Sequence, residues 1–257
     1  MYDLIAAVRL PFFVDLSRPE DVLNNTWNFY LNTEEDISVG VWHTLPVGQY
    51  EENDGREPGW HQETLGDGHP VVIYLHGNVG TRWNIISIFI SFFQILSAAG
   101  YHVFSLDYRG FGDSSGEPSE SGLTTDALFL YHWVKRHSRA CLVCLWGHSL
   151  GSGQFPVTLP SGFPVEALIL EAPYTRIGEV VESHALAKTL TSPLMILHSE
   201  DDGVVPHHMG LKLYQISLQT RRRLNTSAEV KMISFSARHG YSHNNVYLEP
   251  GLPTMVG

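Results

Sequence analysis

The chain has 257 residues, 43% of them hydrophobic, which is enough to bury one sizeable core. Its formal charge of −11, from 27 acidic and 16 basic residues, repels polyphosphate and argues against a nucleic-acid partner. No apolar run is long enough to span a bilayer, and Asp3 and Arg9 make the first 15 residues unlike a signal peptide. We therefore expect a soluble or membrane-peripheral protein.

The N-terminal part is predicted to be an arm, residues 1–36, that packs on a single domain formed by residues 37–257. A first strand is expected at 37–42. Residues 46–70 are rich in Gly, Glu, Asp and Pro and lack periodicity, which predicts an exposed loop.

The rest of the chain alternates apolar runs with helical segments. Continuous apolar runs predict strands buried on both faces at 71–75, 102–106, 141–146, 167–170, 194–197 and 230–235. Helices are expected at 82–99, 122–137 and 207–218. This alternation predicts one α/β domain, with a mostly parallel central sheet, helices on both faces and ligands bound at the carboxyl edge of the strands.

A Gly-x-Ser-x-Gly pentapeptide follows the run at 141–146, and its central residue is Ser149. A strand that leads directly into this pattern is typical of a nucleophile elbow, where the backbone turns so tightly that only small residues fit on either side. Gly147 and Gly151 meet that need. A chance pentapeptide in a glycine-rich loop is the alternative interpretation. The elbow interpretation makes Ser149 a candidate nucleophile.

A serine nucleophile needs an imidazole base and a carboxylate that orients it. Asp202 follows the run at 194–197 and is the candidate acid, with Asp201 and Glu200 as adjacent alternatives. His243 follows the run at 230–235 and is the candidate base, with His239 as the alternative. The order Ser, Asp, His along the chain is the α/β-hydrolase order.

Acyl transfer also needs N–H donors for the oxyanion, and removing one typically costs ~3 kcal/mol. We assign these donors to Leu150, directly after the nucleophile, and Asn78, in the loop after the run at 71–75. Cys141 and Cys144 form a Cys-x-x-Cys pattern inside a predicted strand. Side chains three apart on a strand point to opposite faces, which disfavours a redox or metal site.

With these residues in place, the chain resembles the subfamily of α/β-hydrolase domain proteins that contains lysophosphatidylserine lipase and its close paralogue. The resemblance covers most of the chain and rests on Leu75-His76-Gly77-Asn78, Leu106-Asp107-Tyr108-Arg109-Gly110-Phe111-Gly112-Asp113-Ser114, Trp146-Gly147-His148-Ser149-Leu150-Gly151, Leu197-His198-Ser199-Glu200-Asp201-Asp202 and Gly240-Tyr241 with His243. It implies the α/β-hydrolase fold, ester hydrolysis in single-chain lipids such as lysophospholipids or monoacylglycerols, and Ser149, Asp202 and His243 as the triad. No metal or organic cofactor is implied.

The resemblance also implies association with the endoplasmic reticulum membrane, while the lack of a spanning segment makes a cytoplasmic location the alternative. Residues 85–96 are apolar but too short to cross a bilayer, so core packing is favoured over membrane contact. The sequence carries no signal for an oligomeric state.

Several positions depart from the family pattern. Pro156, Pro160 and Pro164 occupy the stretch where the family has a long helix after the elbow, and proline costs ~3 kcal/mol or more inside a helix. Residues 177–190 leave room for only one short helix where the family has a longer cap, and Val79 replaces a glycine of the oxyanion loop. These departures suggest a truncated, splice or gene-model variant.

The sequence therefore predicts a lipid serine esterase that forms an acyl-enzyme on Ser149. A catalytically impaired α/β-hydrolase-like protein is the alternative, because the shortened segments remove support from the elbow. A thioesterase or acyltransferase would use the same triad and differ only in the bond cleaved or the acceptor.

Overall fold

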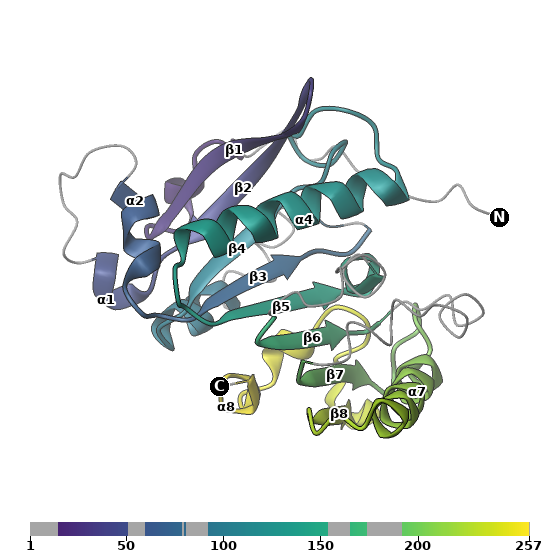
Figure 1. The fold of residues 1–257 in the computed structure, drawn as a ribbon. Helices are drawn as coiled ribbons and strands as arrows, with labels where there is room; N and C mark the ends of the chain where they lie inside the picture. The colour runs from purple at the N-terminus through teal and green to yellow at the C-terminus, as the bar shows by residue number, and fades with distance from the viewer. Residues whose placement is uncertain are drawn as a thin grey trace. The chain divides into compact units, whose positions relative to one another are not determined.

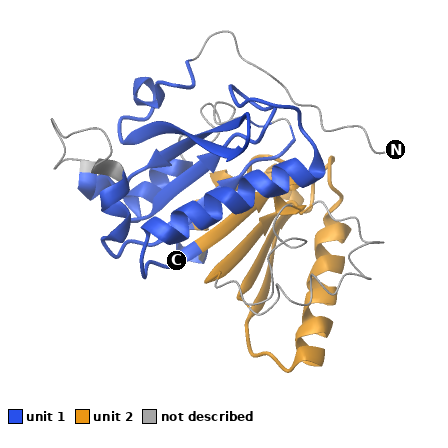
Figure 2. Cartoon of the chain, turned by 45° about the horizontal axis from the view of Figure 1, so that its top comes forward, with its two compact units in different colours: residues 1–143, 253–257 blue, residues 144–252 orange. Residues whose placement is uncertain are grey.

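The computed structural model describes residues 15–50, 60–78, 80, 92–153, 165–173 and 192–256 (Figure 1). The chain divides into two compact units, coloured separately in Figure 2. Unit 1 comprises residues 1–143 and 253–257, and unit 2 comprises residues 144–252. The expectation that residues 37–257 form a single domain stays a prediction.

The described residues of unit 1 contain four strands, hydrogen-bonded in the order β1 (Thr26–Glu34), β2 (Ile37–Thr44), β4 (His102–Leu106) and β3 (Val71–Leu75). β1 pairs with β2 and β2 with β4 in antiparallel fashion, whereas β3 and β4 are parallel and start in register at Val71 and His102. The predicted bounds of β3 and β4 are confirmed, and β2 extends two residues beyond the predicted 42.

β1 was not predicted, because residues 26–34 lie inside the stretch assigned to the N-terminal arm. Among the described strands it pairs only with β2, and it has exposed and half-buried positions along most of its length. Its asparagines, Asn28 and Asn32, have low strand propensity. An edge strand tolerates such residues because part of its surface faces water, so that part of the arm is a sheet strand.

Two helices of unit 1 pack on opposite faces of its sheet. Trp133 of α4 (Glu120–His137) has its ring centroid 6.0 Å from that of Phe104 on β4. The helical residues 92–98 contact the other face, where the Phe92 and Phe93 rings each lie 5.9 Å from Tyr74 on β3. Phe104 pairs with Ile73, the neighbour of Tyr74, so Phe104 and Tyr74 point in opposite directions. Helices on both faces are therefore confirmed in this unit.

Glycine stops the first of these helices as predicted, whereas α4 begins two residues before the predicted 122. Gly100 adopts φ +86° after residues 92–98, with its N–H bonded to the Ser97 carbonyl and the Tyr101 N–H bonded to the Leu96 carbonyl, a Schellman motif. α4 begins after Ser119, whose side chain accepts the N–H of Gly122. The expected loop at 46–70 instead contains short helical turns where it is described: α1 (Val47–Tyr50), α2 (Trp60–Glu63) and η2 (Thr64–Gly66). A further turn, η1 (Pro19–Asp21), precedes β1.

Unit 2 is built on four parallel strands in the order β5 (Val143–His148), β6 (Ala167–Glu171), β7 (Leu194–Ser199) and β8 (Val230–Phe235). Helix α7 (His207–Leu224) contacts β7 and β8. Shorter helical segments are η3 (Ser149–Gly153), η4 (Ala237–His239), η5 (Val246–Leu248) and α8 (Leu252–Val256), which ends in unit 1. The mostly parallel α/β architecture is confirmed.

Helix α7 is longer than the predicted 207–218. The residues that follow 218 are mostly good helix formers, and the helix continues until Asn225, which adopts a left-handed conformation with φ 51°. The N–H groups of Asn225 and Thr226 bond to the carbonyls of Arg222 and Arg221, which closes a second Schellman motif. Asparagine, rather than glycine, supplies the helix stop here.

Several predicted segments lie outside the described residues. These are the post-elbow stretch at 154–164, the cap stretch at 177–190, Val79 and the first part of the helix expected at 82–99. Within the described part of the chain, no helix combines the length and the apolar character that a membrane crossing needs.

Candidate active site

The backbone turns tightly at Ser149, the residue that follows β5. Ser149 has φ 50°, a left-handed conformation that non-glycine residues rarely adopt, and the chain continues directly into η3. A Cβ atom added at Gly147 would lie 2.5 Å from the carbonyl oxygen of Gly151. The turn therefore requires glycine at position 147, and it leaves the Ser149 side chain at the carboxyl end of β5.

His243 is the histidine that the structure places beside Ser149. The two nearest side-chain atoms, His243 Nε2 and Ser149 Oγ, are 3.0 Å apart. His239, the alternative base, is exposed in η4, where its ring stacks on Tyr241 at 5.2 Å. His148 also holds His243, because its Nε2–H donates to the His243 carbonyl at 2.9 Å. The ring and the backbone of His243 are thus both bound by residues at the elbow.

The second ring nitrogen of His243 meets the carboxylate of Asp202. Nδ1–H donates to Asp202 Oδ2 at 2.8 Å, and the other oxygen, Oδ1, accepts the N–H groups of Val204 and Val205, each at 2.8 Å. His198 lies on the far side, with Nε2 3.3 Å from Oδ2 and 2.9 Å from the Val205 carbonyl. These bonds fix the tautomer in which His243 Nε2 is free to accept a proton from Ser149.

The same contacts keep Asp202 ionised. Burial raises the pKa of this carboxyl group, but the hydrogen bonds from His198, His243 and the Val205 N–H outweigh burial and hold the pKa well below its usual range. An ionised carboxylate is what a neighbouring imidazole needs when it takes up a proton.

The alternative acids, Asp201 and Glu200, bind the segment that carries His243. Asp201 Oδ1 accepts the Ser242 N–H at 3.0 Å and the Ser199 hydroxyl. Glu200 Oε2 accepts the Ala237 N–H at 3.2 Å. Ser242 has φ 51°, so the residue before His243 is itself in a strained conformation. Both carboxylates therefore orient the loop after β8.

Sequence reasoning missed two polar residues close to Asp202. One is His198, on β7; the other is Glu171, the last residue of β6. Glu171 is buried, and its Oε2 accepts the Trp146 indole N–H at 2.9 Å. Burial, and to a smaller extent the nearby negative charge of Asp202, raises the pKa of Glu171 to about 7. The signal for each one was a polar residue directly after an apolar run, at 167–170 for Glu171 and at 194–197 for His198.

The two candidate oxyanion donors belong to different units. Leu150 is the second residue of η3, directly after Ser149, in unit 2. Asn78 lies in the turn after β3, in unit 1. That turn is anchored by His76, whose Nδ1 is 2.8 Å from the Gly77 carbonyl oxygen and whose ring contacts Tyr108. The role of both N–H groups stays a prediction.

Cys141 and Cys144 are both free thiols, and the first lies before β5 rather than inside it. The Cys141 thiol donates to the Leu65 carbonyl at 3.3 Å. Burial raises the pKa of the Cys144 thiol to about 12, which keeps it protonated at neutral pH. The argument that a strand separates the two side chains therefore does not apply to Cys141, and a protonated Cys144 thiol is a poor nucleophile.

Comparison with solved structures identifies the fold. The esterase Pf2001 of Pyrococcus furiosus superposes with a TM-score of 0.69 at 16% identity, covering 97% of this chain and 96% of that chain. Est1E from Butyrivibrio proteoclasticus superposes with a TM-score of 0.63 at 14% identity, covering 89% and 95%. At such low identity the likeness concerns the fold alone.

Comparison with known sequences is more specific. Residues 70–155 match the alpha/beta hydrolase fold family. Lysophosphatidylserine lipase ABHD12 of Danio rerio is 40% identical over 284 residues, which cover 97% of this chain and 73% of that protein. Protein ABHD12B of Homo sapiens is 38% identical over 278 residues, with 95% and 75% covered. Both alignments are longer than this chain, so the relatives contain residues that have no counterpart here. With this identity over nearly its whole length, the chain belongs to the ABHD12 family of α/β-hydrolase fold proteins.

Proposed function

We propose that the chain is a serine esterase that hydrolyses carboxylic esters of single-chain lipids, with Ser149, His243 and Asp202 as its catalytic triad. The observation that carries this proposal is a continuous hydrogen-bond path within unit 2. It runs from Ser149 Oγ to His243 Nε2 at 3.0 Å, and from His243 Nδ1 to Asp202 Oδ2 at 2.8 Å. A serine hydroxyl is a weak nucleophile, and this path supplies its general base and the orienting carboxylate.

In the first half of the reaction, Ser149 Oγ attacks the ester carbonyl carbon while His243 Nε2 accepts the hydroxyl proton. The carbonyl oxygen becomes an oxyanion, for which we propose the Leu150 and Asn78 N–H groups as donors. The C–O bond to the alcohol then breaks, and the imidazolium gives its proton to the leaving oxygen. The products of this half are the free alcohol and an ester of Ser149.

In the second half, His243 takes a proton from water, and the resulting hydroxide attacks the acyl carbon. The imidazolium then returns a proton to Ser149 Oγ as the acid leaves. Asp202 keeps its negative charge throughout and stabilises the imidazolium in both halves. The depressed pKa of Asp202 supports this role.

The same geometry favours an active enzyme over a catalytically impaired one. All three side chains lie among the described residues and are mutually bonded, and the elbow is in its strained conformation at Ser149. A protein that has lost its chemistry would have no need to maintain a serine at φ 50° with an imidazole beside its hydroxyl.

The substrate class is proposed from the relatives. Relatives at 38–40% identity in several species are named lysophosphatidylserine lipases, which favours a lipid with one acyl chain and a polar head group. Such lipids reside in membranes, so we also propose peripheral contact of this chain with a membrane surface. Location at the endoplasmic reticulum is the prediction of the family resemblance, and imaging of the tagged chain in cells tests it.

The experiment is a hydrolysis assay with the purified full chain. We expect fatty acid release from lysophosphatidylserine or a monoacylglycerol, slower release from two-chain phosphatidylserine, and none with Ser149→Ala. An acyl-CoA cleaved faster than any oxygen ester would instead favour a thioesterase. Equal release by the wild type and Ser149→Ala would refute the proposal.

A further inference from the structure

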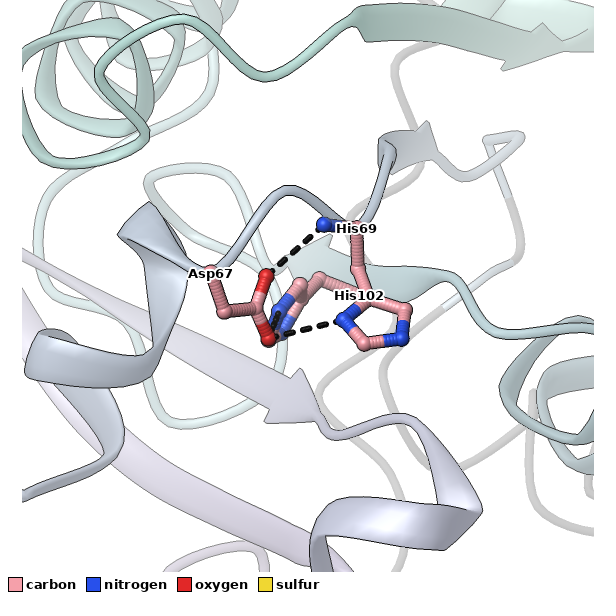
Figure 3. A group of neighbouring side chains, drawn as sticks. All are labelled: Asp67, His69 and His102. Atoms are coloured by element: carbon pink, nitrogen blue, oxygen red, sulfur yellow. Dashed lines mark hydrogen bonds and ion pairs between the residues drawn. The ribbon is translucent and has the colours of Figure 1, made fainter.

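A second polar cluster lies in unit 1, where β3 and β4 begin. Asp67 and His69 belong to the turn before β3, and His102 is the first residue of β4 (Figure 3). One ligand atom from each lies within 4.8 Å of the other two. Asp67 Oδ2 is 2.8 Å from His69 Nδ1 and 3.4 Å from His102 Nε2, so both rings direct a nitrogen at one carboxylate oxygen.

The backbone holds these three side chains in place. Gly68, with φ +99°, lets the chain turn between Asp67 and His69, and the His69 N–H donates to Asp67 Oδ1 at 2.8 Å. The His102 N–H bonds to the Pro70 carbonyl at 2.9 Å, which ties the turn to the start of β4. The cluster is therefore preorganised by parallel pairing of the two strands.

The donor set and its spacing suit a zinc ion. Two imidazoles and a carboxylate are common zinc ligands, and tetrahedral bonds of about 2.0–2.1 Å place donor atoms about 3.3 Å apart. The 3.4 Å between His102 Nε2 and Asp67 Oδ2 already matches that spacing. His69 must retreat by about half an ångström to match it, and its side chain, 43% exposed, has room to do so. The exposed side of the cluster also gives an ion a path of entry and a position for water.

The ring of His102 is also oriented by a neighbouring histidine. His102 Nδ1 lies 3.0 Å from His43 Nε2, and a metal on His102 Nε2 would place the remaining proton on Nδ1, where His43 can accept it.

We propose that Asp67, His69 and His102 bind one zinc ion, with water as the fourth ligand, and that the ion ties the turn before β3 to the start of β4. Because an unfolded chain does not hold the three ligands together, binding stabilises the folded state. The site belongs to unit 1, does not depend on the proposed esterase activity, and is tested without an activity assay.

The test uses the full chain stripped of metal with a chelator and then titrated with zinc chloride. Equilibrium dialysis should give one tight zinc per wild-type chain, and the midpoint of thermal unfolding should rise with zinc concentration. Asp67→Asn and His69→Ala each remove a ligand and should weaken this binding by more than about tenfold. His208→Ala removes an exposed histidine of α7 and serves as the matched control that keeps the tight site.

The variants are chosen so that the result decides the proposal. The His69 side chain is 43% exposed, so His69→Ala should fold, with a thermal midpoint near that of the metal-free wild type. Cobalt(II) bound to the wild type should give the intense visible absorption of a tetrahedral site, and His69→Ala should lack it. The same zinc stoichiometry and affinity in the wild type, Asp67→Asn and His69→Ala would overturn the proposal, as would a wild-type midpoint that zinc does not move.

Discussion

Each unit of the molecule contains a cluster in which an aspartate carboxylate bonds a buried histidine, and the two clusters differ in the group that meets the second ring nitrogen. In unit 2, His243 bridges Asp202 and the hydroxyl of Ser149. In unit 1, His102 bridges Asp67 and the ring of His43. An Asp–His pair therefore has no fixed function. A serine hydroxyl on the second ring nitrogen of the histidine favours nucleophilic catalysis. Two histidine nitrogens directed at the same carboxylate oxygen, as in unit 1, favour metal binding.

The backbones of the two clusters differ as well. The triad region places two non-glycine residues, Ser149 and Ser242, at φ 50° and 51°. The tight turn of the unit 1 cluster uses Gly68, for which a positive φ costs little. Backbone strain at non-glycine residues is typical of catalytic sites. A site that only has to hold an ion can be built on an unstrained turn.

The largest expected effect separates the two candidate histidines of unit 2. His243→Ala removes the general base and should lower kcat by about a million-fold. His239→Ala, in which an exposed ring stacked on Tyr241 is lost, should leave kcat unchanged. Steady-state hydrolysis of a single-chain ester measures both. If His239→Ala lost activity and His243→Ala kept it, His239 would be the base and the description of the unit 2 cluster would be wrong.

The second effect concerns the carboxylate. Asp202→Asn preserves shape but lets His243 adopt the wrong tautomer, and should lower kcat by about ten-thousand-fold. Glu200→Gln is the matched control, because the amide oxygen can still accept the Ala237 N–H. If Glu200→Gln lost as much activity as Asp202→Asn, the carboxylate of the triad would be misassigned.

A smaller effect is expected for Asp201, which we treat as a positioning residue. Asp201→Ala leaves the Ser242 N–H without its acceptor and should lower kcat by about tenfold to a hundredfold, with little change in KM. Asp201→Asn keeps an acceptor oxygen and should recover most of this loss. Rescue by asparagine separates the loop-orienting role from an acid role, because an acid would not be rescued.

The smallest expected effect is the change of folding stability with pH, and the change contributed by a residue of unit 2 is opposite in sign to that contributed by a residue of unit 1. Glu171 has its pKa raised to about 7, so the folded state binds its proton more tightly and its contribution to stability falls as pH rises from about 4.5 to 7. His102 has its pKa lowered to about 4, so its contribution falls as pH drops from about 6.5 to 4.

Glu171→Gln tests the first of these contributions. The amide oxygen can still accept the Trp146 N–H, and the variant should gain stability over the wild type as pH rises through this window, by roughly 3 kcal/mol at most. Denaturant unfolding at pH 5 and pH 8 measures the difference. A stability difference between variant and wild type that is the same at both pH values would contradict a raised pKa.

The sequence predicted those parts of the fold that a local pattern specifies. The apolar runs that became β3, β4 and β8 were placed with their observed bounds, and Gly100 marked a helix stop. β1 was not predicted, because this edge strand carries polar residues and so lacks a continuous apolar run. The end of α7 was missed because Asn225 replaces the more usual glycine.

In the candidate site, too, the sequence predicted only what a local pattern specifies. Ser149 follows from a five-residue motif, and Asp202 and His243 follow from their positions after predicted strands. The bonds from His198 to Asp202 and from the Ser242 N–H to Asp201 depend on loop backbones that no short pattern specifies. His102 joins Asp67 and His69 only through the register of β3 and β4, which is why the cluster of unit 1 was not predicted.

The most direct test of the central claim is labelling with a fluorophosphonate probe, followed by mapping of the modified residue by mass spectrometry. The account predicts one adduct per chain, on Ser149, formed rapidly by the wild type and by His239→Ala and absent from Ser149→Ala and His243→Ala. An adduct on a different serine, or equal labelling of the wild type and Ser149→Ala, would contradict it.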